Sequence, residues 1–168
     1  RLSKLLGVTS YPLDAILQKL SELAPLRLAE SWDNVGLLVG NRGTYIEQVM
    51  TCLTITPEVV QEAIERQVGL LVVHHPLPFK PLARITSDTT AGQMLLSLIS
   101  HHVAIYSAHT AFDSSREGIN AQWASGLGLT NVRPLDVSDA GDDESIGSGR
   151  YGVLNEPVSL EELARRAM

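Results

Sequence analysis

The stretch LLVVHHPLPFKP, residues Leu70 to Pro81, joins four aliphatic residues to two adjacent histidines and three prolines. A short, uniformly aliphatic run such as Leu70–Val73 is typical of a strand that is buried on both faces of a parallel sheet. Ligand sites of open α/β sheets lie beyond the carboxyl ends of the strands, so His74 and His75 stand where a functional site is expected. The prolines restrict the backbone that follows and would hold both histidines in position.

Strands and helices alternate on both sides of this stretch. Aliphatic runs predict strands at residues 36–39, 49–55, 70–73 and 103–106. Helical spacing of apolar residues, with Ser, Thr or Pro at several starts, predicts helices at residues 12–24, 56–67, 87–99 and 119–127. This order predicts an α/β fold in which a mostly parallel sheet with right-handed crossovers is flanked by helices.

The chain is predicted to have three parts. Residues 1–135 form the α/β domain that carries the site, and residues 136–150, rich in Asp, Ser and Gly, form a mobile surface loop. Residues 151–168 begin a further strand and a helix that Ser159 can cap. Because this helix has no stop signal and the chain starts without Met, we expect a fragment that lacks the carboxyl-terminal half of its fold.

Composition narrows the class of protein. The chain has 168 residues, 44% hydrophobic, and a formal charge of −6 from 19 acidic and 13 basic residues that form no basic stripe. Nucleic-acid binding is therefore disfavoured, and no apolar run approaches the roughly 20 residues of a membrane span. The single cysteine, Cys52, excludes an internal disulfide and a thiolate metal cage, and a cytoplasmic location is expected.

A second polar segment follows the aliphatic run at 103–106 and carries His109 and Asp113. If this strand neighbours Leu70–Val73, about 4.8 Å away, these side chains come within reach of His74 and His75. Imidazole and carboxylate groups without sulfur are ligands for Zn, Fe, Mn, Co or Ni. Adjacent side chains of an extended backbone point to opposite sides, so two neighbouring divalent ions suit the histidine pair better than one.

Other interpretations of these residues stay open. The histidines could instead satisfy one another in a polar pocket, and His109 could orient Asp113 or a substrate without binding an ion. His101 and His102 follow the end of a predicted helix and are interpreted as caps. Asp33 and Asn34 could serve the site or form a turn before the strand at 36–39.

The glycines of GLLVGNRGT, residues 36–44, are interpreted as turn residues, because the stretch lacks the Lys-Ser/Thr ending of a nucleotide-binding loop.

Four segments together resemble the Nif-three-like family, whose members are often labelled GTP cyclohydrolase I type 2 homologues. They are SWDNVGLLVG (31–40), LLVVHHPLPF (70–79), YSAHTAFDSSREGIN (106–120) and GSGRYGVL (147–154). The resemblance implies a dinuclear metal site in an α/β protein that assembles into a homohexameric ring. It assigns His74 and His75 to one ion each, Asp113 to the ligand set, and His109 to a position beside the metals.

In the family, a further histidine and glutamate ligand come from near the carboxyl terminus, and this sequence does not contain them. The function expected from the resemblance and from metal chemistry is a metal-dependent hydrolase that acts on a small polar or phosphorylated substrate. GTP cyclohydrolase activity is implied by the family's label alone. The alternative is a non-catalytic metal-binding protein that forms a ring and serves as a scaffold or interaction partner.

Overall fold

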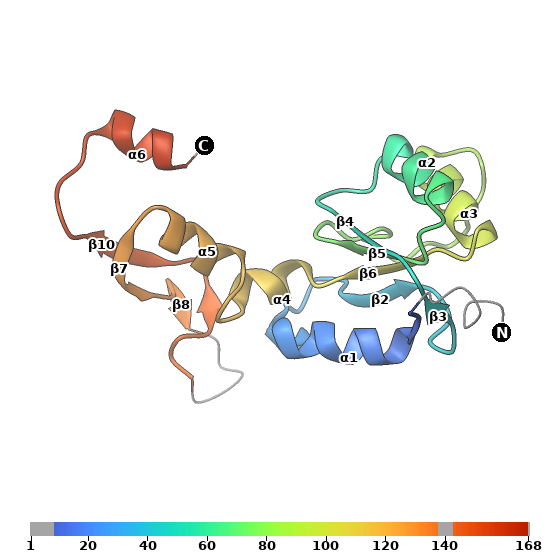
Figure 1. Ribbon diagram of the computed structural model, residues 1–168, viewed down its shortest axis with the longest axis horizontal. Coiled ribbons are helices and arrows are strands. Elements are labelled where there is room, and N and C mark those ends of the chain that lie inside the picture. Colours follow the sequence, from blue (N-terminus) through green and yellow to red (C-terminus); the bar gives the residue numbers. More distant parts are fainter. Residues whose placement is uncertain (1–8, 138–142, 168) are drawn as a thin grey trace. The chain divides into compact units, whose positions relative to one another are not determined.

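The computed structural model describes residues 9–137 and 143–167 and contains two compact units (Figure 1). The first unit comprises Arg1–Glu22 and Ser31–His109, and the second comprises Leu23–Glu30 and Thr110–Met168. No helix in the described ranges combines the length and apolar character that crossing a membrane requires. The predicted domain boundaries at residues 135 and 150 stay a prediction.

The first unit is built on a four-stranded sheet with the order β2 (Gly36–Val39), β6 (Ala104–Ser107), β5 (Leu70–Val73) and β4 (Val49–Cys52). β6, β5 and β4 are parallel, and β2 pairs with β6 in the antiparallel direction. The mixed α/β fold and the mostly parallel sheet are thus confirmed. Val73 lies opposite Ser107, so β5 and β6 end at the same edge of the sheet.

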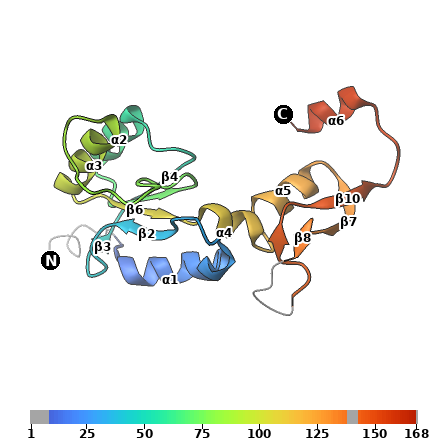
Figure 2. The same ribbon diagram turned by 180° about the vertical axis from the view of Figure 1, so that it is seen from behind.

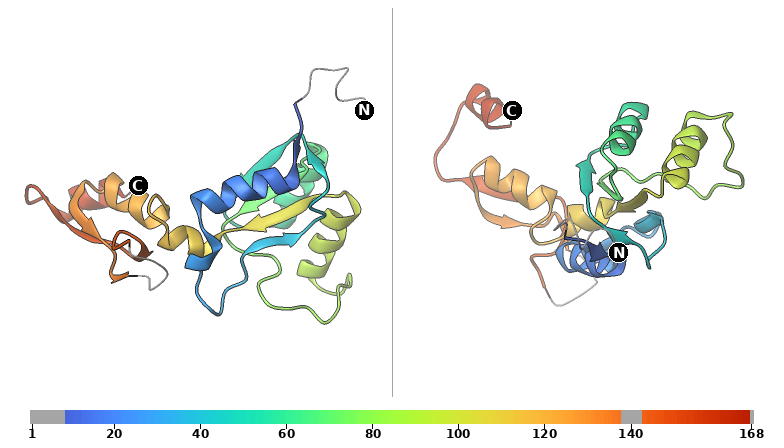
Figure 3. Two further views of the ribbon diagram at one scale, coloured as in Figure 1. Left: turned by 90° about the horizontal axis from the view of Figure 1, so that it is seen from below. Right: turned by 45° about the vertical axis from the view of Figure 1, so that its right-hand side comes forward.

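Helices cover both faces of this sheet. α2 (Pro57–Glu65) and α3 (Thr90–Ser100) lie on one face, and α1 (Leu13–Leu23) lies on the other (Figures 2 and 3). The core between the sheet and the helices α2 and α3 is aliphatic. Its buried members are Ile55, Val60, Ala63, Val68, Leu71, Val73, Leu95, Leu98, Val103 and Ile105. Burial of this apolar surface is the main force that holds the sheet and its ends in place.

Helix starts follow the capping chemistry of the sequence. The Thr56 hydroxyl accepts a hydrogen bond from the Val59 amide, and Pro57 occupies the first helical position of α2. The predicted start of α3 at residue 87 was wrong by about one turn. There the Thr89 hydroxyl accepts from the Gly92 amide at 3.0 Å, whereas the Asp88 carboxylate accepts from a threonine side chain.

Several short elements of the first unit were not predicted. The strand predicted at residues 49–55 ends at Cys52, and β1 (Tyr11–Pro12) pairs with β3 (Tyr45–Ile46). Such two-residue strands depend on a partner that is distant in sequence and carry no periodicity of their own.

The second unit contains α5 (Ile119–Gly126), which lies against β7 (Leu129–Arg133), and β10 (Tyr151–Leu154), which pairs with β7 in the antiparallel direction. A short 3-10 turn, η2 (Leu26–Leu28), also belongs to this unit. α4 (His109–Ser114) starts at the last residue of the first unit.

The ends of the predicted acidic loop are paired rather than irregular. β8 (Asp136–Val137) forms an antiparallel pair with β9 (Gly147–Ser148), while residues 138–142 of the predicted loop lie outside the described residues. Beyond them, α6 (Leu160–Arg166) starts at Ser159, whose hydroxyl accepts from the Glu162 amide at 3.1 Å as predicted.

Candidate metal centre

The backbone brings two histidines to the edge of the sheet where β5 ends. The Ser107 hydroxyl, at the end of β6, donates a hydrogen bond to the His74 carbonyl at 2.7 Å. On the other side, the His75 amide donates to the Leu53 carbonyl at 2.9 Å, just beyond β4. His74 and His75 are therefore fixed from both neighbouring strands, and their position follows from the parallel pairing of the sheet.

His109 joins these two residues to form a cluster of three imidazoles. The ring centroids of His74 lie 5.1 Å from those of both His75 and His109, and the centroids of His75 and His109 are 5.9 Å apart. One nitrogen from each ring lies within 4.8 Å of the others. Nitrogens this close can converge on a metal ion, so His109 qualifies as a candidate ligand on the same geometric grounds as the predicted pair.

A buried carboxylate orients the ring of His109. The Asp33 side chain has no exposed area, and its Oδ1 lies 2.9 Å from His109 Nδ1 and accepts the Asn34 amide at 2.7 Å. Because an ionised carboxylate can only accept, this contact favours the tautomer of His109 that has its proton on Nδ1, which would leave the lone pair of Nε2 for an ion. This carboxylate–histidine pattern is common where a histidine binds a metal.

Thr54 contacts the second ring in a comparable way. Its Oγ1 lies 2.6 Å from His75 Nδ1, and the hydroxyl can accept the Nδ1 proton and leave Nε2 for an ion. Thr54 was not predicted from the sequence, although it lies two residues beyond β4 at the same edge of the sheet. Asp33 was interpreted as either a site residue or a turn residue, and the structure gives it contacts of both kinds.

Asp113 lies in α4, four residues after His109, and is partly buried. The segment is helical, which is the condition under which residues four apart lie on one helix face. The Asp113 carbonyl accepts a hydrogen bond from the Asn120 side chain at 3.1 Å. Asp113 belongs to the second unit, and its role as a metal ligand stays a prediction.

The structure bears on two of the structural interpretations, the helix cap at His101 and the turn in the glycine-rich stretch. His101 ends α3, and its Nδ1 lies 2.8 Å from the Ser97 carbonyl, which confirms that it caps the helix. In the glycine-rich stretch, the Thr44 amide donates to the Asn41 carbonyl at 3.0 Å, which confirms a turn there.

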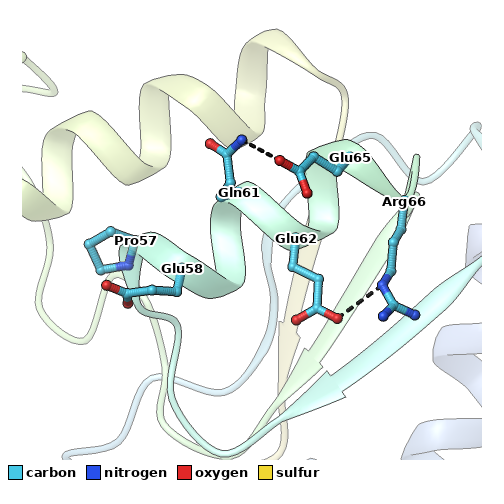
Figure 4. A pocket seen from close by; sticks show the side chains of 6 residues that line it. All are labelled: Pro57, Glu58, Gln61, Glu62, Glu65 and Arg66. Carbon is cyan, nitrogen blue, oxygen red and sulfur yellow. Dashed lines mark hydrogen bonds and ion pairs between the residues drawn. The ribbon is translucent and has the colours of Figure 1, made fainter.

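A separate hollow of about 610 Å³ lies along α2 and is shown in Figure 4. Four of its side chains pair with one another, since Gln61 bonds to Glu65 at 2.6 Å and Arg66 to Glu62 at 2.9 Å. Such pairs stabilise the exposed face of a helix, and among the residues that the structure describes, no candidate group of metal ligands includes a side chain of this hollow.

Loss of the Asp33 carboxylate should weaken metal binding by about 10–100-fold, the usual cost of removing a partner that orients a metal-binding histidine. Asp33→Asn keeps the size and an acceptor oxygen but removes the charge that faces His109. The measurement is a Zn²⁺ competition titration against a chromophoric chelator, with the exposed Asp88→Asn as the matched control. Equal affinities in both variants would show that Asp33 has no such role.

Cys52, at the end of β4, is half-buried, and burial raises the pKa of its thiol. The thiolate is the reactive form, so the folded protein should react with iodoacetamide at pH 8 more slowly than the same protein in urea. Mass spectrometry of samples quenched over time measures both rates. A folded protein that reacts as fast as the unfolded one would contradict the assignment of Cys52 as a core residue.

An α/β sheet with a histidine cluster at the carboxyl edge of its parallel strands defines the class of this protein. The model of the Duf34/NIF3 (NGG1p interacting factor 3) family matches residues 12–168. The chain therefore belongs to the Duf34/NIF3 family, which confirms the resemblance found in the sequence.

Individual relatives agree with this assignment. The chain is 37% identical over 147 residues to a GTP cyclohydrolase 1 type 2 homolog of Clostridium acetobutylicum, a match that covers 88% of this chain and 54% of that protein. It is also 37% identical over 139 residues to NIF3-like protein 1 of Bos taurus, with 82% of this chain and 37% of that protein covered. The chain thus spans about half the length, or less, of these relatives.

Solved structures share the fold. Reduced HcgD from Methanocaldococcus jannaschii superposes with a TM-score of 0.81 at 30% identity, over 95% of this chain and 60% of that one. A Bacillus cereus protein related to NIF3 matches with a TM-score of 0.72 at 34% identity, over 76% of this chain and 36% of that one.

Proposed function

We propose that this protein is a metal-dependent hydrolase, in which His74, His75 and His109, together with Asp113, hold two divalent ions. The observation that carries the proposal is the convergence of three imidazole nitrogens within 4.8 Å of one another. The partners of two of these rings support it, because Asp33 and Thr54 each engage an Nδ1 atom and so direct the other nitrogen of the ring outward.

The donor set fits an ion of intermediate softness. Neutral imidazoles suit Zn, Fe, Co and Ni, and the added carboxylate of Asp113 extends the set to Mn. When bound, such an ion acts as a Lewis acid toward a carbonyl or phosphoryl oxygen and lowers the pKa of water. The chain itself holds these side chains in position. Backbone hydrogen bonds at the strand ends fix the positions of His74 and His75, and the contact with Asp33 orients the ring of His109.

The substrate class proposed is a small polar or phosphorylated molecule. The exposed ring of His75 and the half-buried rings of His74 and His109 leave the cluster open to a ligand at the protein surface. Relatives named GTP cyclohydrolase 1 type 2 homologs support a nucleotide as the first candidate to try. The cytoplasmic location and the homohexamer stay predictions.

Hydrolysis is tested with protein that has been freed of metal and then loaded with Zn²⁺, Mn²⁺, Fe²⁺, Co²⁺ or Ni²⁺. Each form is assayed against nucleoside triphosphates and simple phosphate esters. Turnover should require an ion, disappear in His74→Ala, and persist in His101→Ala, which changes a histidine that caps a helix. Turnover that survives both metal removal and His74→Ala would refute the proposal. Ions that bind at the cluster without turnover of any substrate would favour the non-catalytic scaffold.

A further inference from the structure

Arg150, between β9 and β10, is a partly buried arginine that binds backbone carbonyls. Its guanidinium donates to the carbonyls of Gly147 and Gly149 at 2.6 Å each and to the Ser115 carbonyl at 2.9 Å. A longer contact of 3.4 Å reaches the Ser145 carbonyl. Burial lowers the pKa of this guanidinium, because a charged group loses hydration inside the protein. The carbonyls replace the lost water, and the side chain thereby joins two segments of backbone.

Two glycines allow the chain to fold back on its own arginine. Gly147 and Gly149 have φ angles of 153° and 63°, a region of backbone space that favours glycine. Both belong to the GSGR stretch, residues 147–150, which lies in one of the four segments that carry the family resemblance. The metal chemistry proposed above gives this stretch no role.

The Ser115 carbonyl directly follows α4 and stands two residues after Asp113. Ser115 is buried, and its amide and hydroxyl donate to the Phe112 carbonyl at 3.3 and 3.0 Å, which closes the last turn of the helix. The Ser115 carbonyl accepts from the Gly118 amide at 3.2 Å as well as from Arg150. Arg150 is therefore part of the hydrogen bonding that ends the helix on which Asp113 lies.

A further hydrogen bond holds the backbone of Asp113 itself. The Asn120 side chain, in α5, donates to the Asp113 carbonyl at 3.1 Å. This part of the chain is thus held at Asp113 by α5 and at Ser115 by the loop that carries Arg150. A metal ligand needs a fixed geometry, which hydrogen bonds from neighbouring residues provide.

We propose that Arg150 is a positioning residue for the metal centre, which holds the turn after α4 and so fixes the carboxylate of Asp113 in the orientation that binds an ion. The inference rests on the proposed function, because it takes Asp113 as a ligand. It assigns to the arginine of the GSGR stretch a role in metal binding beyond the stability of its own loop.

Binding of Co²⁺ to the full chain tests this role, because the visible absorption of Co²⁺ changes when a ligand is lost. Arg150→Met removes the five N–H donors and keeps an unbranched side chain. It should weaken Co²⁺ binding by about 10–100-fold and change the absorption in the same way as Asp113→Asn. Arg116→Met is the matched control, since Arg116 is exposed and pairs with Asp143. It should match the wild type in affinity and absorption.

A merely structural role of Arg150 predicts a different result. Trp123 lies in α5 of the second unit, so its fluorescence in a Trp32→Phe background follows the urea unfolding of that unit. If Arg150→Met lowers the urea midpoint but keeps the Co²⁺ affinity and absorption of the wild type, the positioning role is overturned.

Should Arg150→Met fail to fold, Arg150→Lys takes its place, because lysine keeps the charge and has fewer donors. It should bind Co²⁺ more weakly than Arg116→Lys, the same change at the exposed arginine. Equal binding by these two variants would overturn the role.

Comparison with Asp113→Asn separates this inference from the proposed function. If Asp113→Asn changes the absorption and Arg150→Met does not, the inference fails while Asp113 remains a ligand. If Asp113→Asn binds Co²⁺ like the wild type, Asp113 is not a ligand, and both the proposed ligand set and this inference are refuted.

Discussion

Replacement of His74 by alanine should weaken binding of Zn²⁺ by more than about 100-fold. Loss of a residue that merely orients a metal ligand costs about 10–100-fold, and the loss of a direct nitrogen donor costs more. His74 is central in the cluster, since its ring lies 5.1 Å from each of the other two. Competition titration against a chelator of known affinity measures the change.

A matched histidine provides the control for this experiment. His101 is exposed and bonds to the Ser97 carbonyl at the end of α3, so His101→Ala should leave zinc affinity unchanged. If His74→Ala and His101→Ala bind zinc equally well, the cluster is only a group of polar side chains. Circular dichroism of both variants checks that the fold persists.

The largest effect on stability is expected from Leu98→Ala in α3. Leu98 has no exposed area and belongs to the core beneath the sheet. Removal of its side chain forfeits hydrophobic burial and leaves a cavity, and the free energy of unfolding should fall by about 2–5 kcal/mol. Urea unfolding followed by Trp32 fluorescence in a Trp123→Phe background measures this change, because Trp32 lies in the first unit.

Leu96, two positions earlier in the same helix, is the control because its side chain is 42% exposed. Leu96→Ala removes the same atoms at the surface and should change the free energy of unfolding by less than about 1 kcal/mol. Similar losses in the two variants would contradict the assignment of the core.

The central elements of the fold were predictable because their signals are local. The strands at Gly36–Val39 and Leu70–Val73 have the predicted bounds, since each is a short apolar run. The helix that starts at Pro57 was equally clear, because the cap and the proline are adjacent in sequence. These signals can be recognised in the sequence without knowledge of the strands that pair with these elements.

The contacts that orient the histidine rings were harder to predict, because they join residues that are far apart in the sequence. Asp33 and His109 are 76 residues apart, and Thr54 and His75 are 21 apart. Only the strand order β2-β6-β5-β4 brings these pairs to one edge. The histidine pair was visible as a motif, whereas the role of Thr54 had no signal beyond its place after a strand.

The most direct measurement is anomalous diffraction from crystals of the zinc-loaded protein. Density for zinc is predicted in the space between the rings of His74, His75 and His109, with imidazole nitrogens at about 2.0–2.1 Å from the metal. Zinc present in the crystal but bound elsewhere, with the three rings contacting only protein and water, would contradict the metal centre proposed for this protein.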